Sequence, residues 1–107
     1  HTMGDRRMAE IRTDGGSFYV YTHSGGYEFA GVARRALDAA APRRGDLTYA
    51  ARIVVDQLTA AGRDQELGYG LLLAPDAEDE YSSDNSPSIV IDLHEWTVTD
   101  RSMAEAL

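Results

Sequence analysis

The sequence predicts an α+β domain: a mostly antiparallel sheet with two helices packed on one of its faces. Three observations indicate this class. Residues of β-forming type alternate near both ends of the chain, two stretches between residues 29 and 61 repeat apolar residues at helical spacing, and strands do not alternate with helices as they do in parallel sheets. The expected element order is ββααβββ.

The first two strands form a predicted hairpin. Residues 8–13 alternate in polarity, Asp14-Gly15-Gly16 tolerates the positive φ angles of a tight turn, and residues 17–23 return to β-forming types. Because side chains alternate across a sheet, the second strand has two different faces. One face carries Phe18, Val20 and Thr22, and the other carries Tyr19, Tyr21 and His23.

Two amphipathic helices follow the hairpin. In the first, over residues 29–40, apolar residues recur every three or four positions until Pro42 stops the pattern. Asp46 is a favourable N-cap for the second, whose apolar stripe covers residues 47–61. Gly62 is the expected C-cap of that helix.

Three short strands are expected in the last third of the chain. Residues 69–74 form an apolar run that ends at Pro75, residues 88–93 alternate again, and residues 96–99 follow a turn at His94-Glu95. The side chains expected to pack under the helices are Phe18, Val20, Leu71, Leu73, Ile89, Ile91 and Leu93. The opposite face then carries Tyr19, Tyr21, His23, Val90, Asp92 and His94, with no helix to cover it.

Length and composition indicate one domain. A chain of 107 residues holds one core, and its 43% hydrophobic and 26% charged residues are typical of a globular domain. We expect a tag remnant and disordered start at 1–7, the α+β domain at 8–100 and a frayed tail at 101–107. The chain has no cysteine, no apolar run of the about 20 residues that span a bilayer and no signal-peptide pattern, so we expect a cytoplasmic protein.

The acidic balance restricts the class of partner. The formal net charge is −8. This charge repels nucleic-acid phosphates and anionic lipid headgroups, so direct binding to nucleic acid or to a membrane is disfavoured. Two interpretations stay open: the charge serves solubility, or it attracts a basic partner surface, including one that normally holds nucleic acid.

Two surfaces are candidates for binding a partner protein. Tyrosines on an uncovered sheet face are typical of contacts, including self-association into a homo-oligomer, although they also pair across strands with solvated hydroxyls. The segment 77–87 is acidic with little to bury, so it is either a docking arm or a solvated loop. The candidate partner-binding residues are Tyr19, Tyr21, His23, Asp76, Glu78, Asp79, Glu80, Tyr81 and Asp84.

A small-ligand site is the alternative. The Ser24-Gly25-Gly26 turn precedes a helix, and the free N–H groups of a helix start bind anions. Arg34 and Arg35 are the candidate partners of a phosphate, although they also suit the end of the first helix as favourable charges. The chain has no lysine and so cannot form a Walker-type phosphate loop.

Metal binding and catalysis find little support in the sequence. His23, Asp92 and His94 fall on one predicted face and are a legitimate ligand set, but only if their strands are neighbours in the right register. The chain has no Gly-x-Ser-x-Gly elbow and no His-Glu-x-x-His helix. We predict no metal, no cofactor and no enzymatic activity.

The stretch Tyr21-Thr22-His23-Ser24-Gly25-Gly26-Tyr27, followed by a predicted helix, resembles a strand-turn-helix phrase of small uncharacterised phage and prophage proteins, in which an aromatic residue often replaces Ser24. The likeness covers less than a tenth of the chain. It implies a phage or prophage origin and brings no activity with it. From that origin we expect a non-enzymatic protein that binds and modulates a host protein; the alternative is a protein that sequesters a small ligand or nucleotide.

Overall fold

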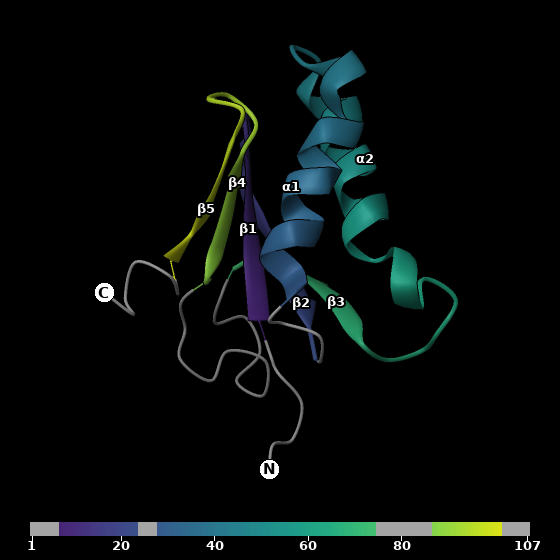
Figure 1. Ribbon diagram of the computed structural model, residues 1–107. Helices are drawn as coiled ribbons and strands as arrows, with labels where there is room; N and C mark the ends of the chain where they lie inside the picture. Colours follow the sequence, from purple (N-terminus) through teal and green to yellow (C-terminus); the bar gives the residue numbers. More distant parts are fainter. Residues whose placement is uncertain (1–6, 24–27, 75–86, 102–107) are drawn as a thin grey trace.

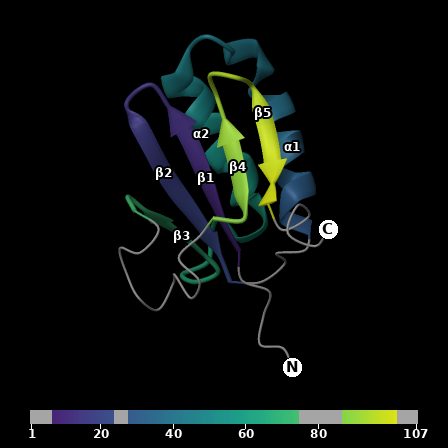
Figure 2. The same cartoon turned by 90° about the vertical axis from the view of Figure 1, so that its left-hand side faces the viewer.

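The computed structural model describes residues 7–23, 28–74 and 87–101 of the chain. A five-stranded sheet carries both helices on one face, which confirms the predicted α+β class (Figure 1). Figure 2 views the sheet with the helices behind it. The elements are β1 (Arg7–Thr13), β2 (Gly16–Thr22), α1 (Phe29–Ala39), η2 (Ala41–Arg43), α2 (Leu47–Leu58), η3 (Ala60–Gly62), β3 (Tyr69–Leu72), β4 (Ile89–Asp92) and β5 (Thr97–Asp100), where η marks a short 3-10 turn.

The strands lie in the order β3-β2-β1-β4-β5, so β3 and β5 are the edges of the sheet. Three of the neighbouring pairs are antiparallel, whereas the inner strands β1 and β4 are parallel to each other, with Ile11 opposite Ile91. The sheet is therefore mostly antiparallel, as predicted. The parallel pair was not predicted, because residue patterns along one strand do not reveal its neighbour.

The hairpin of β1 and β2 forms at the predicted turn. Gly16 has a φ of 126°, a backbone conformation that side chains rarely adopt. The hydroxyl of Thr13 donates to the carbonyl oxygen of Gly16 at 2.7 Å and accepts from the N–H of Gly15 at 3.3 Å. This turn sets the register in which Ile11 faces Phe18, so both side chains point toward the helices.

The core lies between the two helices and one face of the sheet. Both helices contribute apolar stripes, and β1, β2 and β4 contribute the residues that alternate toward them. Five of the seven predicted core residues pack here: Phe18, Val20, Ile89, Ile91 and Leu93. Core packing therefore follows the period-two pattern of the central strands.

Helix α2 begins where the sequence predicts and ends earlier. The carboxylate of Asp46 accepts a backbone N–H of the first turn at 3.4 Å and so caps the helix. The helix ends at Leu58 and not at Gly62. The hydroxyl of Thr59 donates to the carbonyl oxygen of Val55 at 2.9 Å, and a 3-10 turn takes over from the α-helix at this point.

The three leucines at the end of β3 and just after it differ from the expectation. Leu71 and Leu73, predicted to pack under the helices, are 64% and 86% exposed, whereas Leu72 between them is 7% exposed. Leu71 is opposite Val20 and so lies on the helix side of the sheet, but β3 is an edge strand whose outer side the helices leave uncovered. The prediction was wrong because alternation assigns a side chain to a face and says nothing about how far the helices extend over it.

Several predictions fall outside the described residues. They concern the residues Ser24, Gly25, Gly26, Asp76, Glu78, Asp79, Glu80, Tyr81 and Asp84, the first six residues and the tail from 102. Strand β1 includes Arg7, which the sequence assigned to the disordered start. Neither of the described α-helices has the length and apolar content needed to cross a membrane.

Candidate functional site

The sheet face opposite the helices is buried around Tyr21. Tyr21, Met8 and Leu72 form a second apolar cluster in which they are 6%, 6% and 7% exposed, and Tyr19 packs against them. His23 is exposed beyond the end of β2, with its Nδ1 3.3 Å from the Tyr21 hydroxyl oxygen. We expected an exposed aromatic patch here, and the burial of Tyr21 corrects that expectation. These tyrosines pack the face and do not form an open contact surface.

Polar side chains on the same face contact one another. Glu10 Oε2 accepts hydrogen bonds from Arg12 Nε at 3.0 Å and from the Ser17 hydroxyl at 2.7 Å, and Arg12 Nη1 lies 3.9 Å from Asp92 Oδ2. The hydrogen bond to Glu10 raises the pKa of Arg12. Burial, and next the negative charge of Glu10, raises the pKa of Tyr19. These contacts hold β1, β2 and β4 together.

The raised pKa of Tyr19 predicts a loss of stability in alkali. The folded state holds the phenol proton more strongly than the unfolded chain, so this contribution is complete below the ordinary pKa of 10.0 and is lost as the pH rises through the higher folded-state pKa. We expect the urea midpoint of unfolding to fall as the pH rises above about 10, and to fall less in Tyr19→Phe, which has no phenol to ionise. An equal fall in both proteins would contradict this assignment.

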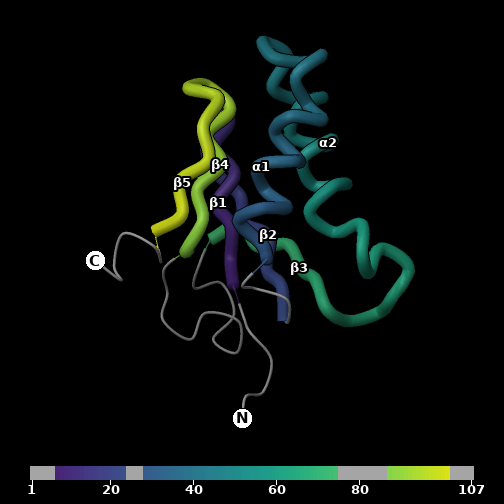
Figure 3. Tube along the Cα trace, in the orientation of Figure 1, coloured from purple at the N-terminus to yellow at the C-terminus, as the bar shows by residue number. Residues whose placement is uncertain are grey.

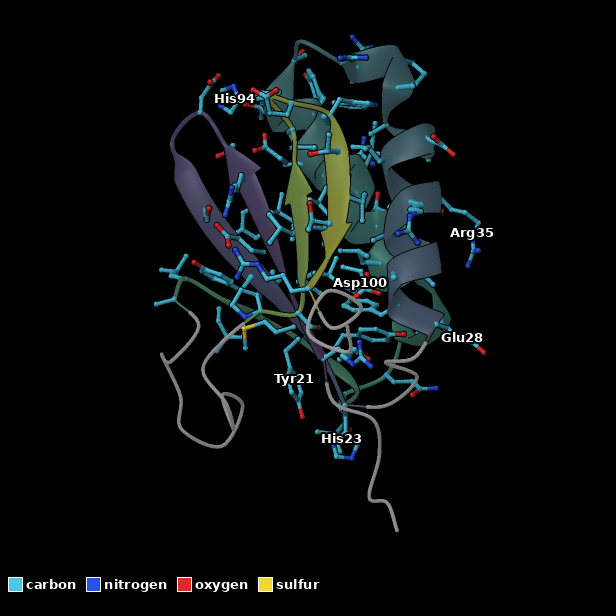
Figure 4. The ribbon with its side chains drawn as sticks, turned by 60° about the vertical axis from the view of Figure 1, so that its left-hand side comes forward. Tyr21, His23, Glu28, Arg35, His94 and Asp100 are labelled. Carbon is cyan, nitrogen blue, oxygen red and sulfur yellow. The ribbon has the colours of Figure 1, made fainter. Side chains whose placement is uncertain are left out.

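The two histidines lie at opposite ends of the sheet (Figure 4). Because β2 runs antiparallel to β1 and β4 runs parallel to it, the residues that follow β2 and β4 are far apart. His94 Nε2 lies 3.1 Å from Asp14 Oδ1, and Asp92 Oδ1 accepts the N–H of His94 at 2.9 Å. Within the described ranges, no three His, Asp or Glu side chains group in a way that could hold a metal ion. The combination of His23, Asp92 and His94 as a ligand set is therefore wrong.

A groove of about 460 Å³ opens between the start of α1 and the end of α2. Apolar walls from Phe29, Val32 and Leu58 meet the polar side chains of Glu28, Arg35 and Gln57. Figure 4 shows Glu28 at the start of α1 and Arg35 farther along the helix. Of the two predicted ligand-binding arginines, Arg35 lines this groove, and Arg34 is exposed outside it.

Among the described residues, the most exposed large apolar side chains lie in β3 and on either side of it along the chain. Leu67, Leu71 and Leu73 are 80%, 64% and 86% exposed, and in the described part of the chain only Tyr49, at 53%, is another exposed large hydrophobic residue. We call these three residues the leucine edge. Beside them a second groove, of about 230 Å³, lies between β3 and the end of α2 and is lined in part by Val55 and Leu71. Figure 3 traces the chain from α2 through the turn into β3.

Two contacts hold β3 in position. A Cβ on Gly62 would lie 2.9 Å from the ring of Tyr69, so the glycine lets the turn after α2 approach β3 closely. The N–H of His23 donates to the carbonyl oxygen of Gly68 at 2.9 Å, which extends the ladder between β2 and β3. Strand β3 is thus attached to β2 through the ladder and packs against the turn after α2 through the ring of Tyr69.

The ladder also determines which backbone groups of β3 point outward. Hydrogen-bonded and non-hydrogen-bonded pairs alternate in an antiparallel ladder, so the bond between His23 and Gly68 implies that Gly70 bonds to β2. Tyr69 and Leu71 then direct their N–H and C=O groups away from β2. No strand of the described chain pairs with that side of β3.

Sequence reasoning missed the leucine edge because it assigned Leu71 and Leu73 to the core. One signal was present in the sequence. Three consecutive leucines, from 71 to 73, cannot all face the same side of a strand, so at least one has to lie away from the helices. The run of leucines does not show that Leu71 and Leu73 are exposed, because the exposure of a side chain depends on where its strand lies in the sheet.

Comparison of the chain with protein-family models, with curated proteins and with solved structures found no match. The fold and the site define the chain as a small α+β protein with an exposed apolar edge strand.

Proposed function

We propose that the protein is a non-enzymatic interaction protein, encoded by a phage or prophage, that binds and modulates a host protein in the cytoplasm. The leucine edge is the observation that carries this proposal. Three exposed leucines beside an edge strand are typical of a contact between proteins, since monomeric domains normally cover or charge such edges. The leucine edge is the proposed contact surface in place of the buried Tyr21.

The net charge of −8 supports a partner with a basic surface, such as one that otherwise holds nucleic acid. In the sequence, residues 76–84 follow β3 closely, and their side chains remain predicted contacts: Asp76, Glu78, Asp79, Glu80, Tyr81 and Asp84. Homo-oligomerisation through the sheet face that carries Tyr19 and Tyr21 has less support, because Tyr21 is 6% exposed. His23, at the end of that face, is exposed and remains a predicted contact.

Capture from a host lysate tests the proposal when wild type is compared with the double variant Leu71→Asp/Leu73→Asp. The partner recovered by wild type is identified by mass spectrometry, purified and titrated against each protein. We expect the double variant to bind it about 30-fold more weakly or worse, because a carboxylate in an apolar contact loses its hydration. Tyr49→Asp, at an exposed apolar residue on the first turn of α2, is the matched control and should bind as wild type. Equal binding by wild type and the double variant would overturn the proposal.

A small-ligand binder is the second candidate, and the groove at Arg35 favours it. Its volume of about 460 Å³ lies within the roughly 300–1,000 Å³ of ligand pockets, and a guanidinium recognises carboxylates and phosphates. Calorimetry with a panel of nucleotides tests this candidate. Tight binding that Arg35→Gln removes would support it over a purely protein-binding role.

A further inference from the structure

We propose that the partner binds by adding an extended segment to β3 as a sixth strand, with one apolar side chain of that segment in the groove between β3 and α2. This inference rests on the proposed function, since it specifies how the leucine edge is used. Three features of the described chain carry it: the outward backbone groups of β3, the groove beside them and the charge around them.

The backbone of β3 is a template for another strand. Tyr69 and Leu71 direct their N–H and C=O groups away from β2, and no described strand pairs with them. Each residue therefore offers one donor and one acceptor to an incoming segment. Extended peptides bind to sheet edges through such groups and obtain specificity from pockets for alternate side chains.

The groove supplies such a pocket. Its volume of about 230 Å³ is below the roughly 300–1,000 Å³ of small-molecule sites, which suits a single side chain. Leu71 lies on the helix side of the sheet, opposite Val20, and Val55 of α2 lines the same groove. A residue of the added strand that faces Leu71 points to the same side, because directly opposed residues share a face. Its side chain would therefore lie beside Leu71 on the helix side of the sheet, where the groove opens.

The opposite edge of the sheet, β5, fits this role less well. Its exposed side chains are Thr97 and Thr99, whereas Val98 packs against the core. A strand added there would cover hydroxyl groups that water already satisfies and would bury little apolar surface. The two edges thus differ in chemistry, and the apolar one is β3.

The charge selects a basic segment of another protein over a second copy of this chain. Pairing two β3 edges would bring together two chains that each carry a net charge of −8. The exposed Asp64 and Glu66, in the turn that leads into β3, would add to this repulsion; the same turn carries Arg63, which lines the groove and donates a hydrogen bond of 3.0 Å to the carbonyl oxygen of Asp56. A segment that alternates apolar residues with arginine or lysine complements both the leucines and the carboxylates.

Hydrogen exchange of the full chain, followed by NMR, tests the added strand directly. The probe is a synthetic nine-residue peptide in which arginine alternates with leucine or valine. In the free protein the amides of Gly70 and Leu72 should exchange slowly, and those of Tyr69 and Leu71 quickly. Saturating peptide should slow the exchange of Leu71 about tenfold or more. The control peptide, with glutamate in place of arginine, should bind about tenfold more weakly or worse.

Two variants separate the backbone from the side chain. Leu71→Ala and Leu71→Pro both lose the leucine side chain, but only proline also removes the outward N–H, which an edge strand tolerates. We expect proline to weaken peptide binding about three- to tenfold beyond alanine. Equal urea midpoints of the two variants show that both remain folded to the same extent.

The outcomes distinguish this inference from the proposed function. Peptide binding without protection of Leu71, or equal affinities of the alanine and proline variants, would overturn strand addition and leave the leucine edge as a contact surface. Failure of the arginine peptide to bind, or protection of Leu71 in a dimer of the free chain, would overturn the basic segment as occupant. A host partner that binds Leu71→Asp/Leu73→Asp normally would instead contradict the proposed function.

Discussion

Replacing Ile91 with alanine is expected to lower the free energy of unfolding by about 2–5 kcal/mol. Ile91 is 0% exposed on β4, where it lies between Ile11 of β1 and Val98 of β5. Strands paired on both sides of β4 cannot easily move into the space that the truncated side chain leaves, so the cavity persists. Urea unfolding followed by circular dichroism measures the loss.

Leu73→Ala is the matched control for Ile91→Ala. Both variants shorten a large aliphatic residue that the sequence pattern assigns to the core, but Leu73 is 86% exposed. Removing apolar surface that is already in water changes the free energy of unfolding by no more than about 0.5 kcal/mol. A loss at Leu73 as large as the loss at Ile91 would contradict the position of β3 outside the cover of the helices.

Replacing Leu72 with aspartate is expected to destabilise the fold on the order of 3 kcal/mol. Leu72 is 7% exposed and packs with Met8 and Tyr21 on the sheet face opposite the helices. A carboxylate at this position would lose its hydration in an apolar cluster, and its protonation would only partly relieve that cost. The urea midpoint at neutral pH measures the effect.

Leu71→Asp is the control for Leu72→Asp, because it introduces the same charge one residue earlier in the strand. Leu71 is 64% exposed, so its carboxylate stays in water and the unfolding midpoint should remain close to that of wild type. Equal destabilisation by the two substitutions would contradict the alternation of faces along β3. The control also supports the binding test, since a folded Leu71→Asp protein that loses its partner has lost a contact and not its structure.

The helix side of the central sheet was predictable from the sequence. Alternation in β2 assigned Phe18 and Val20 to one face, and helical spacing placed two apolar stripes over that face. Asp46 marked the start of α2 through a local hydrogen bond. Each of these features depends on residues that are close together in the chain. Their conformational preferences are the same wherever the segment lies in the fold.

The candidate site was less predictable, because it depends on contacts between distant segments. Leu71 and Leu73 have the composition of a buried strand, and only the position of β3 at the edge of the sheet exposes them. Tyr21 looked exposed because no helix covers its face, yet it is 6% exposed and packs in a cluster with Met8 and Leu72 from the neighbouring strands. Residue type alone could not show that the two leucines are exposed and that the tyrosine is buried.

By itself, the sequence determined the kinds and order of the elements, the two faces of the hairpin and the acidic charge of the chain, because spacing and composition control these properties. The tertiary structure decided the order β3-β2-β1-β4-β5, the separation of His23 from His94 and the exposure of the leucine edge. These depend on which strands pair and how far two helices extend over the sheet, and such long-range choices are made by the packing of the whole core.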